Sequence, residues 1–153
     1  MLLVPKEELA SYIDTPLEPS DWFAIDQQRI NDFADATLDH QFIHVDIEKA
    51  AQTPFGTTIA HGYLTLSLLP YLTAQCGIAP QHILMAINYG SDKLRFLQPV
   101  TVGSEVRALV RLLEVTEKTP GQVLLKCEVT VEIKGQAKPA LIAHTLSLFF
   151  VKA

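Results

Sequence analysis

The chain has 153 residues, of which 48% are hydrophobic and 19% charged, enough apolar material for one domain (residues 1–153) with a sizeable core. Its apolar excess predicts a subunit interface or an apolar cavity, and hence an oligomer. A formal net charge of −5 without adjacent basic residues argues against a nucleic-acid partner, and the lack of a signal-like start predicts a cytoplasmic protein.

The N-terminal third of the chain predicts an arm, a strand, a helix and a loop. Residues 1–20 carry a short helical pattern and are expected to form a packed N-terminal arm. Trp22–Ile25 predicts a short strand, after which Asp26 is placed to cap a helix that should end near Thr37. Residues 38–46 mix polar and apolar side chains without a sustained period, which indicates a structured loop of the kind that often carries catalytic groups.

A buried helix is expected next. Residues 60–75 are apolar on nearly every face, as in a helix enclosed on all sides. Pro70 should cause a kink or a shift of hydrogen bonding about one turn earlier, because proline has no backbone N–H. The apolar run 59–72 is interrupted by His61, Gly62 and Pro70 and is too short to cross a bilayer, so membrane insertion is not predicted.

The second half of the chain changes to the period of β-strands. Apolar residues alternate with polar ones over 105–112 and 123–134, as in strands with one buried face. Turn residues between the runs predict an antiparallel meander of four or five strands over Ile83–Val151, with the apolar helix packed on it in an α+β fold. Cys76 and Cys127 have no CxxC spacing, so neither a disulfide framework nor a zinc site is predicted.

Two groups of residues could carry chemistry. Asp39 and His44 in the predicted loop suit general acid–base work, but their spacing alone is weak support because such pairs arise by chance. Gly62 begins the buried helix, where backbone N–H groups are unpaired and no side chain blocks an approaching carbonyl. It is therefore a candidate oxyanion-hole donor.

Four stretches together resemble the MaoC-type (R)-specific enoyl-CoA hydratases, in particular their NodN-like branch. They are FADATLDHQFIHVD at 33–46, FGTTIAHG at 55–62, AINYG at 86–90 and RFLQPVTVG at 95–103. The resemblance covers most of the chain from Trp22 to the C-terminus. It implies a hot-dog fold, in which an antiparallel sheet wraps around a long central helix, and a homodimer with the two sheets joined edge to edge.

The resemblance also implies an activity, the reversible hydration of trans-2-enoyl-CoA to (R)-3-hydroxyacyl-CoA in fatty acid metabolism. The catalytic pair falls on Asp39 and His44, and the thioester carbonyl falls on the Gly62 amide. Such a reaction needs a polarised carbonyl, together with an acid and a base that deliver water to C3 and a proton to C2. The expected partner is an acyl-CoA or acyl-carrier-protein thioester, and no metal or other cofactor is expected.

Further residues are candidates for supporting roles. Gln41 and His61 are candidate substrate-binding residues, and Arg95 could meet the phosphates of coenzyme A, although a solvated strand edge explains Arg95 equally well. No metal site is predicted, because His40 and His44 have no third ligand at regular spacing.

The chain departs from the family pattern at Leu38, where Gly is common, and at Gln41-Phe42, where Asn-Pro is common. The NodN-like branch accepts Gln and an aromatic residue there, but Leu38 could change the backbone geometry of the loop. Two alternative functions stay open. One is a hot-dog acyl thioesterase, since a fold does not determine a function. The other is a non-catalytic acyl-thioester-binding subunit whose acid–base pair is misplaced by Leu38.

Overall fold

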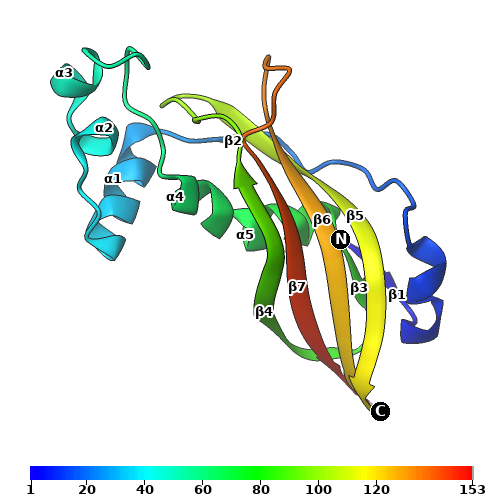
Figure 1. Cartoon of the computed structure of the whole chain (residues 1–153). Coiled ribbons are helices and arrows are strands. Elements are labelled where there is room, and N and C mark those ends of the chain that lie inside the picture. Colours follow the sequence, from blue (N-terminus) through cyan, green and yellow to red (C-terminus); the bar gives the residue numbers. More distant parts are fainter. Residues whose placement is uncertain (153) are drawn as a thin grey trace.

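The computed structural model describes residues 1–152 and has at its centre a curled five-stranded sheet with strand order β2-β5-β6-β7-β4. All neighbouring strands in this sheet are antiparallel. The strands are β2 (Phe23–Ala24), β4 (Ile83–Phe96), β5 (Glu105–Thr119), β6 (Gln122–Ile133) and β7 (Leu141–Val151). The predicted α+β class is confirmed, with an antiparallel sheet curved across a helical segment (Figure 1).

The predicted meander is only partly right. β5, β6 and β7 pair in sequence order, but β4 lies beside β7 instead of β5. The connection from β4 to β5 crosses the start of the buried helical segment, where the Ala60 N–H donates to the Val100 carbonyl and the Val102 N–H donates to the Thr58 carbonyl. Alternation along a strand determines which face is buried but not which strand lies next to it, so the sequence did not reveal this order.

The predicted helix after Asp26 is confirmed as α1 (Gln27–Thr37). The Asp26 carboxylate accepts a hydrogen bond of 2.9 Å from the Arg29 N–H, which satisfies one of the unpaired donors of the first turn. Ile30 and Ala34 are buried on its inner face. The helix ends at Leu38, whose backbone is left-handed.

Residues 38–46, predicted as a loop, contain one short helical turn, α2 (Phe42–Val45), and a second short turn, α3 (Ile47–Ala50), follows them directly. Asp46 lies between them and accepts a 3.0 Å hydrogen bond from the Lys49 N–H. Turns of four residues carry too little periodicity to be seen in a sequence pattern, which is why the prediction stopped at a structured loop.

The predicted single helix is divided into α4 (Gly62–Ser67) and α5 (Leu69–Cys76). Pro70 lies in the first turn of α5, where its missing N–H is tolerated, so the chain begins a new helix instead of bending one. The expectation of burial on every face is wrong, because Tyr63 and Tyr71 are 65% and 54% exposed.

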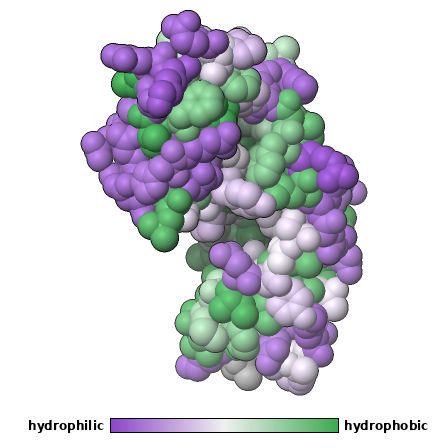
Figure 2. All heavy atoms as spheres, turned by 60° about the vertical axis from the view of Figure 1, so that its left-hand side comes forward, coloured by the Kyte–Doolittle hydropathy of each residue, from purple (hydrophilic) through white to green (hydrophobic). Residues whose placement is uncertain are grey.

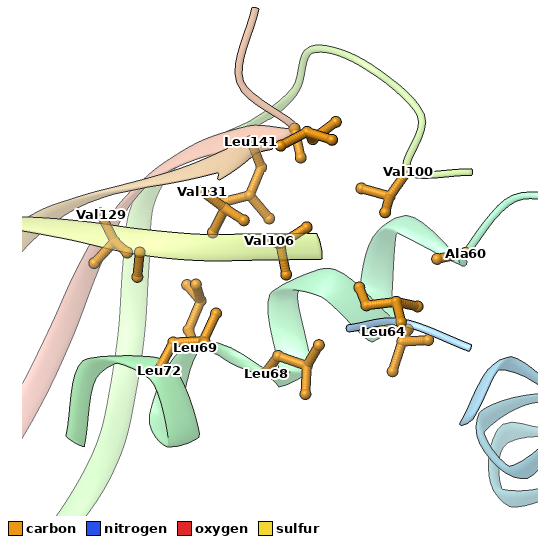
Figure 3. Packing of buried hydrophobic residues seen from close by; sticks show 14 of the residues in the cluster. Ala60, Leu64, Leu68, Leu69, Leu72, Val100, Val106, Val129, Val131 and Leu141 are labelled. Carbon is orange, nitrogen blue, oxygen red and sulfur yellow. The ribbon is translucent and has the colours of Figure 1, made fainter. Parts of the chain in front are cut away.

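The inner sides of both helices pack on the concave face of the sheet. In Figure 3, Leu64, Leu68, Leu69 and Leu72 lie against side chains from β5, β6 and β7. The sheet residues labelled there are Val106, Val129, Val131 and Leu141. Burial of this cluster places the first turn of α4 firmly against the sheet, and the candidate site is built around that turn.

The N-terminal arm covers the other half of the concave face. β1 (Leu2–Val4) pairs in parallel with β3 (Ile78–Pro80), and a 3₁₀ helix, η1 (Lys6–Tyr12), follows. Leu9 is fully buried against a second cluster that includes Leu112 of β5. The N-terminal arm therefore packs against the sheet. Within residues 1–152, no helix has both the length and the apolar character needed to cross a membrane.

Candidate active site

His44 lies on α2 and is buried, with 6% of its surface exposed. Its Nδ1 is 2.6 Å from the Ile59 carbonyl oxygen, which can only accept, so Nδ1 carries the proton and Nε2 has a free lone pair. His44 also lines a cavity of about 330 Å³ together with Gly62 and Phe96. A neutral imidazole with one nitrogen anchored and the other free is arranged as a general base.

The surroundings of His44 hold its pKa below the ordinary value of 6.5. Burial, which disfavours the imidazolium, is the largest cause, and the charge of His61 acts in the same direction. The hydrogen bond to Ile59 and the nearby carboxylate of Asp39 act against this shift without cancelling it. His44 is therefore neutral at pH 7, as a base must be.

The lowered pKa of His44 leads to a prediction about pH. We expect kcat/KM to stay constant as the pH falls to 6.5 and to decline only below it, because His44 is protonated there. The free energy of unfolding should fall as the pH drops below 6.5, because His44 binds a proton there in the unfolded chain but not yet in the native state. Rate and thermal melting profiles between about pH 4 and 8 test this. An activity midpoint above 6.5 would contradict it.

The side chain of Gln27 holds the backbone of His44 through a hydrogen bond, a role that the sequence did not suggest. Its Nε2 donates to the His44 carbonyl at 2.8 Å and to Asn31 Oδ1 at 2.9 Å, while its Oε1 accepts from Thr58 Oγ1 at 2.5 Å. The amide thus joins α1, α2 and the segment that supplies the Ile59 carbonyl. No local signal marks it, because Gln27 and Thr58 are 31 residues apart and glutamine is common on exposed helices.

Asp39 is separated from α1 by Leu38 alone and lies beside His44. Its side chain is 54% exposed, and its Oδ2 is 3.9 Å from His61 Nε2. One side-chain nitrogen or oxygen from each of Asp39, His44 and His61 lies within 4.8 Å of the other two. The structure therefore brings the two predicted acid–base residues together, on a loop that remains open to solvent.

Leu38 holds the backbone before Asp39 in the left-handed region, with φ 63° and ψ 19°. Glycine adopts this conformation readily, whereas a residue with a Cβ is strained in it. Leu38 therefore has a backbone conformation that glycine, the common residue of the family at this position, would adopt without strain.

Replacing Leu38 should consequently change stability without changing activity. We expect Leu38→Gly to be about 1 kcal/mol more stable than Leu38→Ala, which keeps the strain. Little burial is lost in either variant, because Leu38 is 82% exposed. Urea denaturation of both variants and the wild type measures the difference. An alanine variant as stable as the glycine variant would show that no strain is present.

Gly62 is the first residue of α4 and lines the same cavity as His44. Within residues 1–152, its N–H has no hydrogen-bond acceptor. A Cβ at this position would lie 3.1 Å from the ring of Phe96, so a side chain here would narrow the cavity. Figure 2 looks onto the side of the molecule that carries α1 to α3 and shows the surface hollowed near its middle. An unpaired backbone N–H that lines a cavity can donate a hydrogen bond to the carbonyl oxygen of a bound molecule.

The remaining candidates lie at different distances from this cavity. His61 is at the centre of the site, in contact with both Asp39 and His44. Gln41 is exposed at the start of α2. Arg95 does not line the cavity: Phe96, the next residue along β4, does, and neighbouring strand residues point to opposite faces. Arg95 instead donates to the Leu94 carbonyl at 2.9 Å.

The arrangement suits acid–base chemistry better than other reaction types. Burial raises the pKa of the Cys127 thiol to about 12, and it also raises the pKa of Cys76, so both cysteines stay protonated and are poor nucleophiles. The rings of His44 and His61 are stacked with centroids 3.7 Å apart. His44 Nδ1 and His61 Nε2 are each held by a main-chain oxygen, which leaves one nitrogen of each ring free. His40 pairs with Asp35 at the surface.

Comparison with known proteins relates this geometry to a family. A family model described as a MaoC like domain matches residues 8–136. The 3-hydroxyacyl-thioester dehydratase Z of Mycobacterium tuberculosis is 49% identical over 139 residues, which are 91% of this chain and 91% of that protein. Nodulation protein N of Rhizobium leguminosarum bv. viciae is 44% identical over 142 residues, 92% of this chain and 88% of that protein.

Solved structures share the fold. A monoamine oxidase regulatory protein from Archaeoglobus superposes with a TM-score of 0.81 at 22% identity, covering 100% of this chain and 98% of that one. The R-hydratase PhaJ1 from Pseudomonas aeruginosa superposes with a TM-score of 0.76 at 23% identity, covering 98% of this chain and 88% of that one. The chain therefore belongs to the MaoC-like family of dehydratases and hydratases, with the hot-dog fold.

Proposed function

We propose that this protein adds water reversibly to the double bond of a trans-2-enoyl thioester and forms an (R)-3-hydroxyacyl thioester. One observation carries the proposal: a buried neutral imidazole with a free nitrogen and an unpaired backbone N–H line one cavity, and a carboxylate lies beside the imidazole. These are the groups that hydration requires, namely a base, an acid and a donor for the developing enolate oxygen.

Asp39, His44 and Gly62 have separate roles in the proposed reaction. Asp39 and His44 hold one water molecule, and His44 Nε2 takes its proton as the oxygen attacks C3. The Gly62 N–H stabilises the negative charge that moves onto the thioester oxygen. A proton then passes from the pair to C2, so that the atoms of one water are added across the double bond. The chemistry requires neither a resident metal nor a redox cofactor.

The relatives support this assignment. Dehydratase Z is named for 3-hydroxyacyl thioesters, the products of this hydration, and it is similar over nine-tenths of both chains. The R-hydratase PhaJ1 has the same fold and is named for the R configuration. The thioester carrier is coenzyme A or an acyl carrier protein.

Turnover of a chain-length series of enoyl-CoA substrates tests the proposal. We expect enoyl absorbance to disappear without release of free thiol. Thiol release would instead identify an acyl thioesterase. Binding of the substrates without any turnover would identify a non-catalytic acyl-thioester-binding subunit. Repeating the series with enoyl groups on an acyl carrier protein distinguishes the two carriers.

We also propose that the protein forms a homodimer through the free edge of β4. This strand has 14 residues and lies at one end of the sheet order. Leu84, Met85, Ile87 and Tyr89 on it are each at least 43% exposed. A long exposed apolar edge strand is an aggregation hazard unless another chain covers it. Pairing of β4 with β4 of a second copy would remove that hazard and extend the sheet.

Charges placed on this edge should separate the copies. We expect the Met85→Glu/Ile87→Glu double variant to sediment at the mass of a monomer, because a two-fold axis brings the new carboxylates of both copies together. Leu3→Glu is the matched control, since Leu3 and Met85 are both 50% exposed and Leu3 lies in the N-terminal arm. Analytical ultracentrifugation reads out the mass. A wild-type monomer, or dissociation by the control variant, would overturn the assignment of the interface.

A further inference from the structure

His61 lies at the centre of the candidate site but has no part in the proposed chemistry. It is the residue before Gly62 and is 2% exposed. Its Nε2 is 2.9 Å from the main-chain oxygen of Asp39, and its ring stacks on His44 with centroids 3.7 Å apart and planes 24° from parallel. A tilted contact with Phe33, at 5.0 Å between centroids, joins it to α1.

The hydrogen bonds of His61 determine its tautomer. The Asp39 carbonyl can only accept, so Nε2 carries the proton and Nδ1 has only a lone pair. Nδ1 is buried and has no hydrogen-bond partner among residues 1–152. A buried acceptor without a partner lowers stability. An apolar ring would fill the same space without that cost, so filling space does not explain the choice of histidine.

We propose that His61 is a positioning residue that holds the main chain of Asp39 and the imidazole of His44 at a fixed separation. The inference rests on the proposed hydration. Its Nε2–H prevents the exposed loop from moving Asp39 away, and its ring prevents the His44 imidazole from rotating about its bond to the Ile59 carbonyl. Because His61 also directly precedes Gly62, it connects the acid–base pair with the oxyanion donor.

Two substitutions separate the contacts. His61→Phe keeps the stacked ring and loses the donor to Asp39, while His61→Gln keeps an N–H donor near the position of Nε2 and loses the ring. We expect each to lower kcat by roughly 10- to 100-fold, since a displacement of about 1 Å has effects of this size. KM should change little, because neither contact is made to substrate. His144→Gln is the control, as His144 pairs with Glu128 elsewhere on the sheet.

The effect of His61→Phe measured with and without the Asp39 carboxylate distinguishes a positioning role from a purely structural one. In the Asp39→Asn background, His61→Phe should cause almost no further loss of kcat, because there is no carboxylate left to position. A residue that only maintains the fold would instead lower activity by the same factor in both backgrounds and would lower the melting temperature in proportion. Equal losses of that kind, or wild-type kcat in both His61 variants, would overturn the proposal.

NMR of the His44 ring without substrate tests the role of His61 independently of the proposed activity. The ionisable groups that act on His44 are His61 and Asp39. His61→Phe keeps a ring stacked on His44, so the Nδ1–H tautomer of the His44 ring should persist in its NMR spectrum. His61→Gln should show mixed tautomers, because the ring is no longer held. Absence of hydration in the wild type would refute the proposed function, whereas an unchanged His44 spectrum in both variants would refute the role of His61. If His61→Phe does not fold, His61→Gln carries both tests.

Discussion

Asp39→Asn and His44→Ala are each expected to lower kcat on crotonyl-CoA by roughly 10²–10⁴-fold, the usual scale of general acid–base catalysis. The asparagine can hold water but cannot take or return a proton, and the alanine removes the free Nε2 at the cavity. Because the two side chains act on one water, the double variant should be scarcely slower than the slower single variant.

The measurement is kcat and kcat/KM for the wild type, both single variants and the double variant, with thermal melts of each. Asp35→Asn is a suitable control, since Asp35 is an exposed carboxylate on α1 whose partner is His40. Asp39 is half-exposed, so its replacement should leave the melting temperature nearly unchanged. Multiplying defects would mean that the residues act independently. Near-wild-type activity in either single variant would remove that residue from the mechanism.

Gly62→Pro is expected to lower kcat by roughly 10²–10³-fold, the effect of removing one oxyanion donor. Proline deletes the N–H and leaves the helix intact, because Gly62 is the first residue of α4 and that position has no helical acceptor. The residue before proline must be extended, and His61 already has φ −58° and ψ 138°. The backbone can therefore accept the ring.

Gly62→Ala is the matched control for this substitution. Alanine and proline both introduce a Cβ, 3.1 Å from the Phe96 ring, so both require the same small shift of that side chain. Only proline lacks the N–H, and the ratio of the two kcat values therefore isolates the hydrogen bond. Similar rates for the two variants would show that Gly62 serves access to the cavity and not stabilisation of charge.

The sequence predicted best those features that depend on neighbours along the chain. Alternation over 123–134 correctly identified the buried face of β6, and Asp26 correctly marked the start of α1. The acid–base pair was also found, but through its resemblance to a family and not through its spacing. The division of the apolar helix was missed because Pro70 is equally compatible with a kink and with a new first turn.

Other features depend on residues that are distant in sequence. Gln27 gains its role only when folding brings the His44 carbonyl and Thr58 to its amide. Arg95 was a reasonable candidate until the strand placed it on the face opposite Phe96. Hydrogen bonds between distant segments and the side of a sheet that meets a cavity leave no pattern of their own in a sequence.

The sequence by itself therefore determined the α+β class and the buried faces of the strands, because these follow from local periodicity, and its resemblance to a family indicated the acid–base pair. Only the tertiary structure decided that β4 lies beside β7, that Leu38 takes a left-handed backbone, and that His44 has one nitrogen bound and one free. Each of these depends on burial and on hydrogen bonds across the chain, which exist only after the sheet has closed over its helices.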